Sequence, residues 1–451
     1  MSEAEGADAR HRTLLRSSVA NLLLKGLGVV AALGSQIVLA RCLPLEEFGE
    51  YAAMLALSTT LAVVGGGGLA LASVRFLPAY RDTGDWSAFS GFVREAGLRC
   101  GVVAFLAALA AVAVAAAIPA LRVWVPALLA SIPLTVLLGL AALLVGIQQS
   151  IRRPLQAETF NNLLRPIVLT GFIAGLVWLG GPADAVTALL LTAAAVFVTL
   201  VPAWIAIRRG IPIALAGMVN RDDRRLWITA GLGFLVPLIA ASAIERMDTI
   251  FLGLLAGPDL AGIYSVAARL AILIGFATAA VNAMLGPMAA ELIGRKDQDG
   301  LRQLLANGSL LNTGLSILVV AGLLVMGPLL MRLFGSAFVE GADAMRILMF
   351  GQFIQAMLGG GGAMLAMSGR NGALAVVMAV SVALHVLLCV LLIPPYGVIG
   401  AAIATATTLG LSGLVQAVMA QRLLGVDPSI RAGVLLLWRR PRPAAPTGLL
   451  P

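Results

Sequence analysis

Four basic residues lie inside long apolar segments, where a charge is costly. Arg165 is about ten residues into the apolar stretch 154–179, so roughly 15 Å into a bilayer at ~1.5 Å per residue. An arginine at that depth costs at least ~2.5 kcal/mol unless it faces a partner or water. Lys25, Arg246 and Arg269 share this situation. We therefore expect these cations to face a hydrated cavity or a binding partner.

The neighbours of Arg165 indicate which way it faces. Glu158, Asn161, Asn162 and Arg165 are spaced i, i+3, i+4 and i+7, which puts them on one face of a helix. A polar stripe at this depth predicts a helix that faces a cavity rather than lipid. Glu158 could also serve only to neutralise Arg165.

Three other apolar segments carry polar stripes of the same kind. The candidate binding residues are Asn21 and Lys25, with Gln36, on the first segment; Arg246, Glu245 and Asp248, with Ser242 and Thr249, on the seventh; and Arg269, with Ser265, on the eighth. Two alternatives stay open. Arg246 and Arg269 could pair with the nearby carboxylates to hold two helices together, and Lys25 could extend toward the membrane surface.

The balance of charge indicates the ligand. The four cations outnumber the two deep carboxylates, Glu245 and Asp248, even when Glu158 is added. A net positive cavity favours an anion, and the arginine fork suits phosphate oxygens. Asp248 and Glu245 are the candidates for binding a coupling H⁺ or Na⁺.

The elements that position these residues are membrane helices. The 451 residues are 60% hydrophobic and 12% charged, about half the charge of a soluble domain. Repeated apolar runs predict an all-α polytopic membrane protein with about twelve spans. The predicted spans are 14–40, 48–73, 97–118, 124–148, 156–180, 184–207, 227–256, 261–288, 304–334, 342–368, 372–393 and 398–424.

The net charge of +9 is explained by basic residues that gather in the loops on one side of the predicted membrane. Most Lys and Arg residues outside the spans fall on the side of the N-terminus, so the positive-inside rule predicts both termini in the cytoplasm. Nucleic-acid binding is not needed to explain the charge.

No catalytic or metal-binding motif accompanies the spans. The sequence has no P-loop and no nucleophile elbow, and its three cysteines and two histidines lack metal-ligand spacing. We expect no metal and no cofactor. His385 lies in a span and is either a proton relay or a packed neutral residue. The glycine quartets 65–68 and 359–362 indicate either close helix packing or a flexible point.

A short internal repeat indicates duplication. Residues 44–51 and 258–264 both read as a proline followed by Gly-x-Tyr at the start of an apolar helix, six predicted helices apart. The repeat favours two six-helix halves in parallel, related by a pseudo-twofold axis along the membrane normal. Chance similarity between two tight turns is the alternative.

Five segments in order resemble the Wzx-type oligosaccharide flippases of the MATE-like exporter (MOP) superfamily. The segment 39–51 is similar to that family's Ala-Arg…Phe-Gly-x-Tyr entry to its second helix, with Cys42 where the family often has an aliphatic residue. The other segments are 75–80, Asp248 with 262–270, 334–338 and 392–404.

The resemblance implies two six-helix lobes around a cationic cavity with alternating access. It implies transport of an undecaprenyl-pyrophosphate-linked oligosaccharide to the outer leaflet of the bacterial inner membrane, next to membrane lipids and possible polymerase and chain-length partners. The expected parts are an N-terminal lobe 1–210, a linker 211–225, a C-terminal lobe 226–424 and a basic, proline-rich tail 425–451. The alternatives are a cation-coupled MATE-type drug exporter and a polysaccharide polymerase or ligase, which would need a sizeable outer loop.

Overall fold

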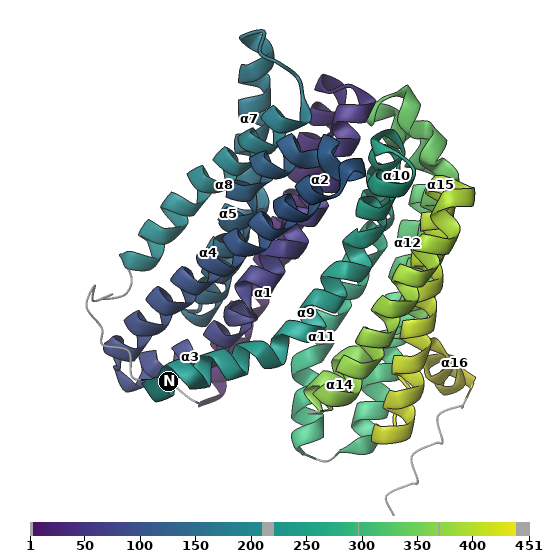
Figure 1. The fold of residues 1–451 in the computed structure, drawn as a ribbon. Helices are drawn as coiled ribbons and strands as arrows, with labels where there is room; N and C mark the ends of the chain where they lie inside the picture. The colour runs from purple at the N-terminus through teal and green to yellow at the C-terminus, as the bar shows by residue number, and fades with distance from the viewer. Residues whose placement is uncertain (1–2, 210–220, 296, 369, 439–451) are drawn as a thin grey trace, which may run out of the picture. The chain divides into compact units, whose positions relative to one another are not determined.

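The computed structural model describes residues 3–209, 221–295, 297–368 and 370–438, and every element in this part of the chain is helical (Figure 1). The elements are α1 (Glu3–Cys42), α2 (Leu45–Gly66), α3 (Leu69–Thr83), α4 (Trp86–Ala117), η1 (Pro119–Trp124), α5 (Val125–Ser150), α6 (Pro154–Glu158), η2 (Thr159–Leu164), α7 (Arg165–Trp178), α8 (Ala185–Arg208), α9 (Arg221–Leu255), α10 (Pro258–Ala271), α11 (Leu273–Gly294), α12 (Gln298–Phe334), η3 (Ser336–Gly341), α13 (Ala342–Leu358), α14 (Gly361–Met367), α15 (Asn371–Leu424) and α16 (Ile430–Trp438).

The predicted fold class is confirmed. Within the described residues, ten helical segments are long and apolar enough to cross a membrane. One of them, α15, contains Gly397 at φ 52° and ψ −126°, a conformation outside the helical region that separates two predicted spans. The 17-residue α13 corresponds to one more predicted span. With these two additions the described helices account for the predicted twelve.

The chain forms two compact units. The first comprises residues 1–267, 328–344 and 382–404, and the second comprises 268–327, 345–381 and 405–451. In the first unit, α5 packs against α2, α4 and α8, and these helices run side by side in Figure 1. One end of this packing holds a buried cluster that includes Phe89, Phe92 and Trp227. The division into lobes at residues 210 and 226 stays a prediction.

Helix α9 belongs to the first unit and packs along α2. A Cβ added to Gly231 of α9 would lie 2.7 Å from the Gly67 carbonyl oxygen, and one added to Gly253 would lie 3.2 Å from Ala53 Cβ. Near its start, Trp227 donates a hydrogen bond to Tyr80 of α3 (2.8 Å). Helix α9 is visibly bent in Figure 1 and contains Pro237. A proline removes one helical hydrogen bond and accounts for such a bend.

Both glycine quartets end helices at points of close packing. The span predicted to continue to residue 73 stops at Gly66, because Gly67 and Gly68 adopt φ of 54° and 73°, where only glycine is unstrained. A Cβ on Gly68 would lie 2.1 Å from the Gly231 carbonyl oxygen. In the second unit, Gly359 has φ 76° and would bring a Cβ to 1.9 Å from the carbonyl oxygen of Pro428. Both quartets therefore lie at points of close packing, and the alternative of a flexible point stays a prediction.

The two copies of the internal repeat meet in the first unit. Helix α2 starts directly after Pro44, and α10 starts at Pro258. A Cβ on Gly49 would lie 1.7 Å from the Pro258 carbonyl oxygen, and one on Gly262 would lie 3.2 Å from Gly49 Cα. The two glycines of the repeat thus form one helix crossing. A pseudo-twofold axis between equivalent helices produces such a self-complementary contact.

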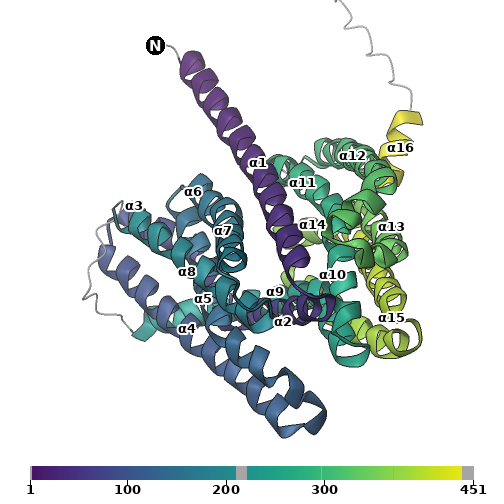
Figure 2. The same ribbon diagram turned by 90° about the horizontal axis from the view of Figure 1, so that it is seen from above.

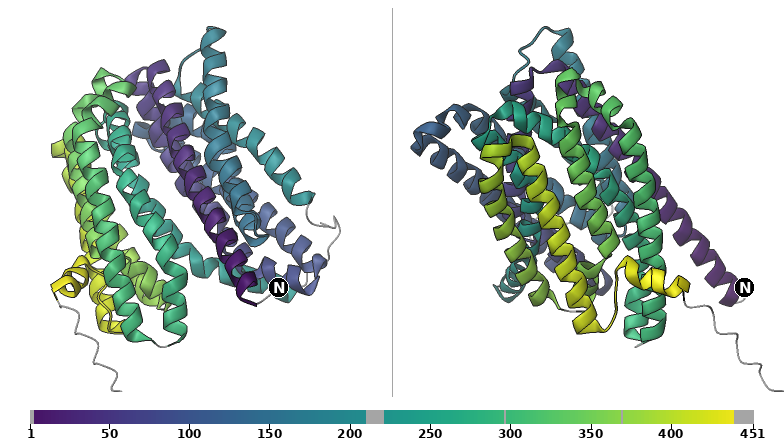
Figure 3. Two further views of the ribbon diagram at one scale, coloured as in Figure 1. Left: turned by 180° about the vertical axis from the view of Figure 1, so that it is seen from behind. Right: turned by 90° about the vertical axis from the view of Figure 1, so that its right-hand side faces the viewer.

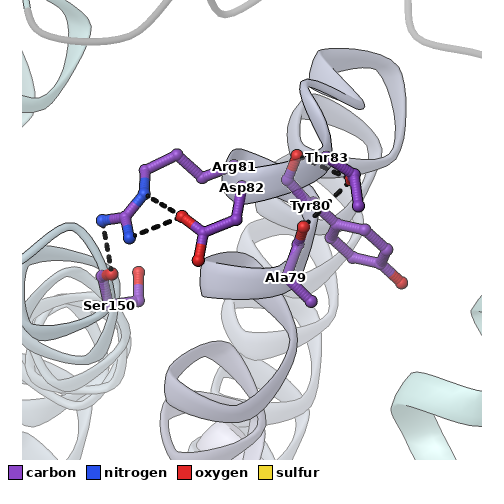
Figure 4. A network of polar contacts seen from close by, with 6 residues as sticks. All are labelled: Ala79, Tyr80, Arg81, Asp82, Thr83 and Ser150. Carbon is purple, nitrogen blue, oxygen red and sulfur yellow. Dashed lines mark hydrogen bonds and ion pairs between the residues drawn. The ribbon is translucent and has the colours of Figure 1, made fainter.

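The end of α3 is fixed to α5 by polar contacts, as Figure 4 shows. Arg81 donates to the Ser150 carbonyl oxygen (3.4 Å) and pairs with Asp82 at 2.9 Å. Thr83 donates to the Ala79 carbonyl oxygen (2.9 Å), which closes the last turn of α3. The carbonyl oxygens of Arg81 and Tyr80 in this turn accept from the backbone N–H groups of Gly84 (3.2 Å) and Asp85 (2.8 Å), so the end of α3 is satisfied.

The second unit is held by small residues and amide contacts. Asn312 of α12 donates to the Ala356 carbonyl oxygen of α13 (2.9 Å). A Cβ on Gly433 of α16 would lie 2.8 Å from the Ala306 carbonyl oxygen, so α16 lies against α12 (Figure 3). A cavity of about 170 Å³ lies beside Asn312 and the Gly359 break. Drug-sized ligands need ~300–1,000 Å³, so this cavity is too small for an oligosaccharide.

Candidate functional site

The segment that carries Arg165 is not the continuous α-helix that the sequence pattern predicts. Between α6 and α7, residues Thr159–Leu164 form a π-helix. Pro166 explains this change, because it has no N–H to donate to the carbonyl of Asn162, and its ring crowds that carbonyl. π-helical turns are rare and occur often at functional sites. Within the Pro154–Trp178 span, Arg165 lies roughly 16 Å from the start at ~1.5 Å per residue.

Five predicted polar residues are joined by direct contacts, and we call them the Arg165 network: Lys25, Glu158, Asn161, Asn162 and Arg165. Arg165 Nη1 donates to Asn161 Oδ1 (3.4 Å), and Asn161 Nδ2 donates to Asn162 Oδ1 (3.3 Å). Asn162 Nδ2 donates to Glu158 Oε2. Lys25 Nζ of α1 lies 3.5 Å from Glu158 Oε1. The structure therefore brings together four of the candidate binding residues, linked through Glu158.

Close backbone packing sets the position of α1 beside this network. Helix α1 runs along α6, η2 and α7 (Figure 2). A Cβ on Gly28, three residues after Lys25, would lie 3.0 Å from the Asn162 carbonyl oxygen. This is the carbonyl that Pro166 leaves without its α-helical donor. The glycine allows α1 to approach closely enough for Lys25 to reach Glu158.

The network faces open space within its own unit. Asn162 is exposed, and the Lys25 side chain is 44% exposed. Arg165 is partly exposed. Because ammonium and amide groups in a span avoid lipid, this face is one that meets water or a polar ligand.

Arg165 has no carboxylate partner among the described side chains. Its hydrogen bond goes to the neutral amide of Asn161, whereas Glu158 pairs with Lys25. The alternative that Glu158 only neutralises Arg165 is therefore wrong, because Glu158 and Arg165 lie two turns apart and the asparagines separate them. An anion that reaches Arg165 would meet a cation not yet neutralised by an ion pair.

The seventh-helix candidates separate into two groups. Arg246 forms an ion pair with its neighbour Glu245, and both side chains are partly exposed. Asp248 is only 2% exposed and accepts hydrogen bonds from Tyr264 Oη of α10 and from the backbone N–H of Thr249 (3.2 Å). Arg246 and Glu245 are adjacent in α9, so this ion pair does not join two helices, and the alternative that Arg246 holds two helices together stays a prediction.

His385 lies in the same buried region as Asp248. It is fully buried, close enough to Asp248 for their charges to interact, and hydrogen-bonded to the Ala404 backbone. Its Nε2 lies 3.7 Å from Cys389 Sγ. Aspartate, tyrosine, histidine and cysteine thus share one buried cluster in the first unit. The structure confirms that His385 is a packed residue, and its role as a proton relay stays a prediction.

Like the seventh-helix candidates, three further candidate residues are not joined to the Arg165 network by the described contacts. Arg269 falls in the second compact unit, at the end of α10. The side chain of Asn21 lies outside the described residues, as do the linker residues 211–220 and the tail residues 439–451. Gln36 is buried, and its Oε1 has no hydrogen-bond partner among the described groups.

Comparison with known families identifies the class of protein. The model of the family described as "Polysaccharide biosynthesis protein" matches residues 14–293, more than half of the chain. The chain belongs to this family. The family described as MatE matches residues 235–391. Among curated proteins, none matches the chain.

Solved structures show the same fold for this polysaccharide biosynthesis family member. An inward-facing multidrug resistance MATE transporter of the MOP superfamily is 12% identical, with a TM-score of 0.68 over 94% of this chain and 100% of that one. A mutant of the Vibrio cholerae MATE transporter VcmN is 14% identical, with a TM-score of 0.60 over 92% and 98%. A MOP superfamily transporter from Pyrococcus furiosus is 15% identical, with a TM-score of 0.62 over 91% and 95%.

Together these matches place the chain in the polysaccharide biosynthesis family and give it the fold of solved MATE transporters, in agreement with the ten candidate membrane spans among the described residues. One residue of the family-like segment 39–51 has a role that the sequence did not indicate. Arg41 donates from Nη2 to the Arg332 carbonyl oxygen (2.7 Å) and from Nε to that of Leu333 (2.8 Å), at the end of α12. Cations commonly cap the last carbonyls of a helix, so Arg41 joins α1 to α12.

Proposed function

We propose that this transporter flips an undecaprenyl-pyrophosphate-linked oligosaccharide from the cytoplasmic to the outer leaflet by alternating access through a cationic cavity. The observation that carries the proposal is Arg165, a cation in mid-span with no carboxylate partner among the described side chains. A cation in a span costs ~2.5 kcal/mol or more unless it faces water or a partner, and an anion is the partner that matches its charge. The pyrophosphate of a lipid-linked sugar supplies that anion, and family membership supplies the link to polysaccharide synthesis.

The remaining parts of the site follow from this assignment. Lys25, Asn161 and Asn162 would bind phosphate oxygens beside Arg165, with Asn21, Arg246 and Arg269 as further contacts. The sugar would cross in water while the polyprenyl chain stays in lipid. Membrane lipids are the surrounding partners, and a polymerase with its chain-length machinery would receive the product.

Asp248 is the stronger candidate for an ion-coupling residue. Glu245 is exposed and paired with Arg246, whereas Asp248 is buried with Tyr264 and next to His385. A buried carboxylate near a histidine can gain or lose a proton with a large change in local energy. We assign it a coupling H⁺, with Na⁺ as the alternative ion.

The proposed setting is the bacterial inner membrane, with both termini in the cytoplasm. The two lobes would be residues 1–210 and 226–424, joined by the linker 211–225. The basic tail 425–451 would then lie at the anionic cytoplasmic surface.

A MATE-type cation-coupled drug exporter is the second candidate, because the similar solved structures include a multidrug resistance MATE transporter. The unneutralised Arg165 argues against it, since a cationic drug would be repelled. The flippase and the exporter differ in the charge of the substrate that they transport, so a transport assay distinguishes them.

The test is transport in vesicles that contain the purified chain. A fluorescent undecaprenyl-pyrophosphate oligosaccharide is placed in one leaflet, and its transfer is followed by chemical quenching. Loss of one charge-assisted hydrogen bond, ~1.5–3 kcal/mol, predicts a ten- to hundredfold slower rate in Arg165→Gln. Arg122→Gln is the matched control, because Arg122 of η1 donates to the Ala116 carbonyl oxygen at the end of α4 and has no ion pair among the described residues. Wild-type flipping by Arg165→Gln would refute the proposal, and efflux of ethidium without flipping would favour the exporter.

A further inference from the structure

Glu158 occupies the donors that a bound phosphate would need. Its Oε1 lies 3.5 Å from Lys25 Nζ, and its Oε2 accepts from Asn162 Nδ2. The Glu158 side chain is 14% exposed, whereas that of Lys25 is 44% exposed. A carboxylate from the protein itself is therefore already placed at the most accessible cation of the Arg165 network.

All hydrogen bonds of the Arg165 network point the same way. Arg165 donates to Asn161, Asn161 donates to Asn162, and Asn162 donates to Glu158. A chain of donors that starts at a guanidinium and ends at a carboxylate polarises each bond in it. Glu158 is thus the anion on which the network converges. The position of the Glu158 carboxylate is therefore the point in the Arg165 network where the donors best stabilise a negative charge.

The backbone, and not only the flexible side chains, holds Lys25 and Glu158 close together. The π-helix places Asn161 and Asn162 after Glu158, and Gly28 brings α1 against the Asn162 carbonyl oxygen at the distance of close contact. The Lys25 ammonium and the Glu158 carboxylate therefore meet without α1 having to move. Displacement of Glu158 needs only a change of its own side chain.

We propose that Glu158 is a resident counter-ion, which the phosphates of the substrate displace from Lys25 and Asn162. This inference rests on the proposed function of the same site. A pyrophosphate has more charge and more acceptor oxygens than one carboxylate, so it can take both donors and also reach Arg165. A singly charged anion gains too little to do so. Glu158 thereby sets selectivity for polyphosphate groups over carboxylates and other small anions.

The experiment is titration calorimetry of the full chain in detergent with inorganic pyrophosphate and, separately, with acetate. Glu158→Gln keeps the side-chain shape and can still accept from Asn162, but it removes the competing charge. We expect it to bind pyrophosphate about two- to fivefold more tightly than the wild type, the scale of a partly exposed ion pair. We expect acetate, which cannot contact Arg165 and Lys25 together, to gain by a somewhat larger factor, so the preference for pyrophosphate over acetate should fall.

Controls separate this inference from the proposed function. Glu291→Gln removes an exposed glutamate that pairs with Arg295 at i+4 and should change nothing. Adding Lys25→Gln to Glu158→Gln should abolish the gain, because Lys25 is the cation that Glu158 releases. Equal or weaker pyrophosphate binding by Glu158→Gln would overturn the counter-ion role, since damage to the fold does not tighten binding. Wild-type affinity in Arg165→Gln would instead overturn the anion site itself.

Discussion

Replacing Gly49 with alanine tests the helix crossing at the centre of the first unit. The added Cβ would lie 1.7 Å from the Pro258 carbonyl oxygen and 3.0 Å from the Gly262 nitrogen. The obstructing atoms are backbone, so no side-chain rotation relieves the contact. To lengthen the 1.7 Å contact with the Pro258 carbonyl oxygen to even 3.0 Å, α2 and α10 must separate by about 1.3 Å.

The expected cost follows from two opposing terms. Overpacking a closely packed contact costs ~1–3 kcal/mol, and a clash with rigid backbone lies at the upper end. The gain from replacing a helical glycine with alanine is ~1 kcal/mol. We therefore expect Gly49→Ala to lower the free energy of unfolding by about 2 kcal/mol.

Gly101→Ala is the matched control, because a Cβ on Gly101 of α4 meets nothing within 4 Å. It should receive only the helix-propensity gain, so the two variants should differ by about 3 kcal/mol. The measurement is unfolding in mixed micelles of increasing denaturing detergent, followed by tryptophan fluorescence. Equal stability of Gly49→Ala and Gly101→Ala would refute the crossing.

Three further changes test other contacts. Pro166→Ala should restore α-helical bonding through the π-helix and stabilise the isolated segment, and yet slow transport at least tenfold, because losing the π-helix changes the rotation of Arg165 about the helix axis relative to Glu158 and Lys25; unchanged transport would count against the role of the π-helix. Arg41→Gln should lower the free energy of unfolding by roughly 1–3 kcal/mol, because two carbonyls at the end of α12 lose a charged donor, and a change within 0.3 kcal/mol in the same denaturation assay would contradict this. Tyr264→Phe removes a hydrogen-bond donor from buried Asp248, so we expect the free energy of unfolding to fall by about 1–3 kcal/mol. We also expect transport to depend differently on the ion gradient. An unchanged dependence would argue against Asp248 as the coupling residue.

The sequence predicted the polar stripe around Arg165 because i, i+4 contacts survive in a slightly distorted helix. Glu158 with Asn162 and Asn161 with Arg165 both meet at this spacing. The π-helix itself was missed. Pro166 directly after Arg165 was the available signal, since a proline inside an apolar span must disturb the preceding turn.

The partners of the charged residues were harder to predict. Pairing of Lys25 with Glu158 joins two helices that are far apart in the sequence, and helix periodicity contains no information on which faces meet. Arg246 was predictable in principle, because Glu245 is its direct neighbour. The internal repeat contains both Gly49 and Pro258, so the sequence indicated that these two segments are related. How closely the two backbones approach depends on packing, which the sequence pattern does not show.

The central claim is that the site built around Arg165 binds the pyrophosphate of a lipid-linked sugar. The most direct measurement compares flipping of two lipids in vesicles with the wild-type chain, one bearing the oligosaccharide on pyrophosphate and the other bearing it on a neutral linker. The account predicts fast transfer of the pyrophosphate lipid, transfer of the neutral lipid slower by about tenfold or more, and a clearly smaller preference between them in Arg165→Gln. Equal transfer of both lipids by the wild-type chain would contradict it.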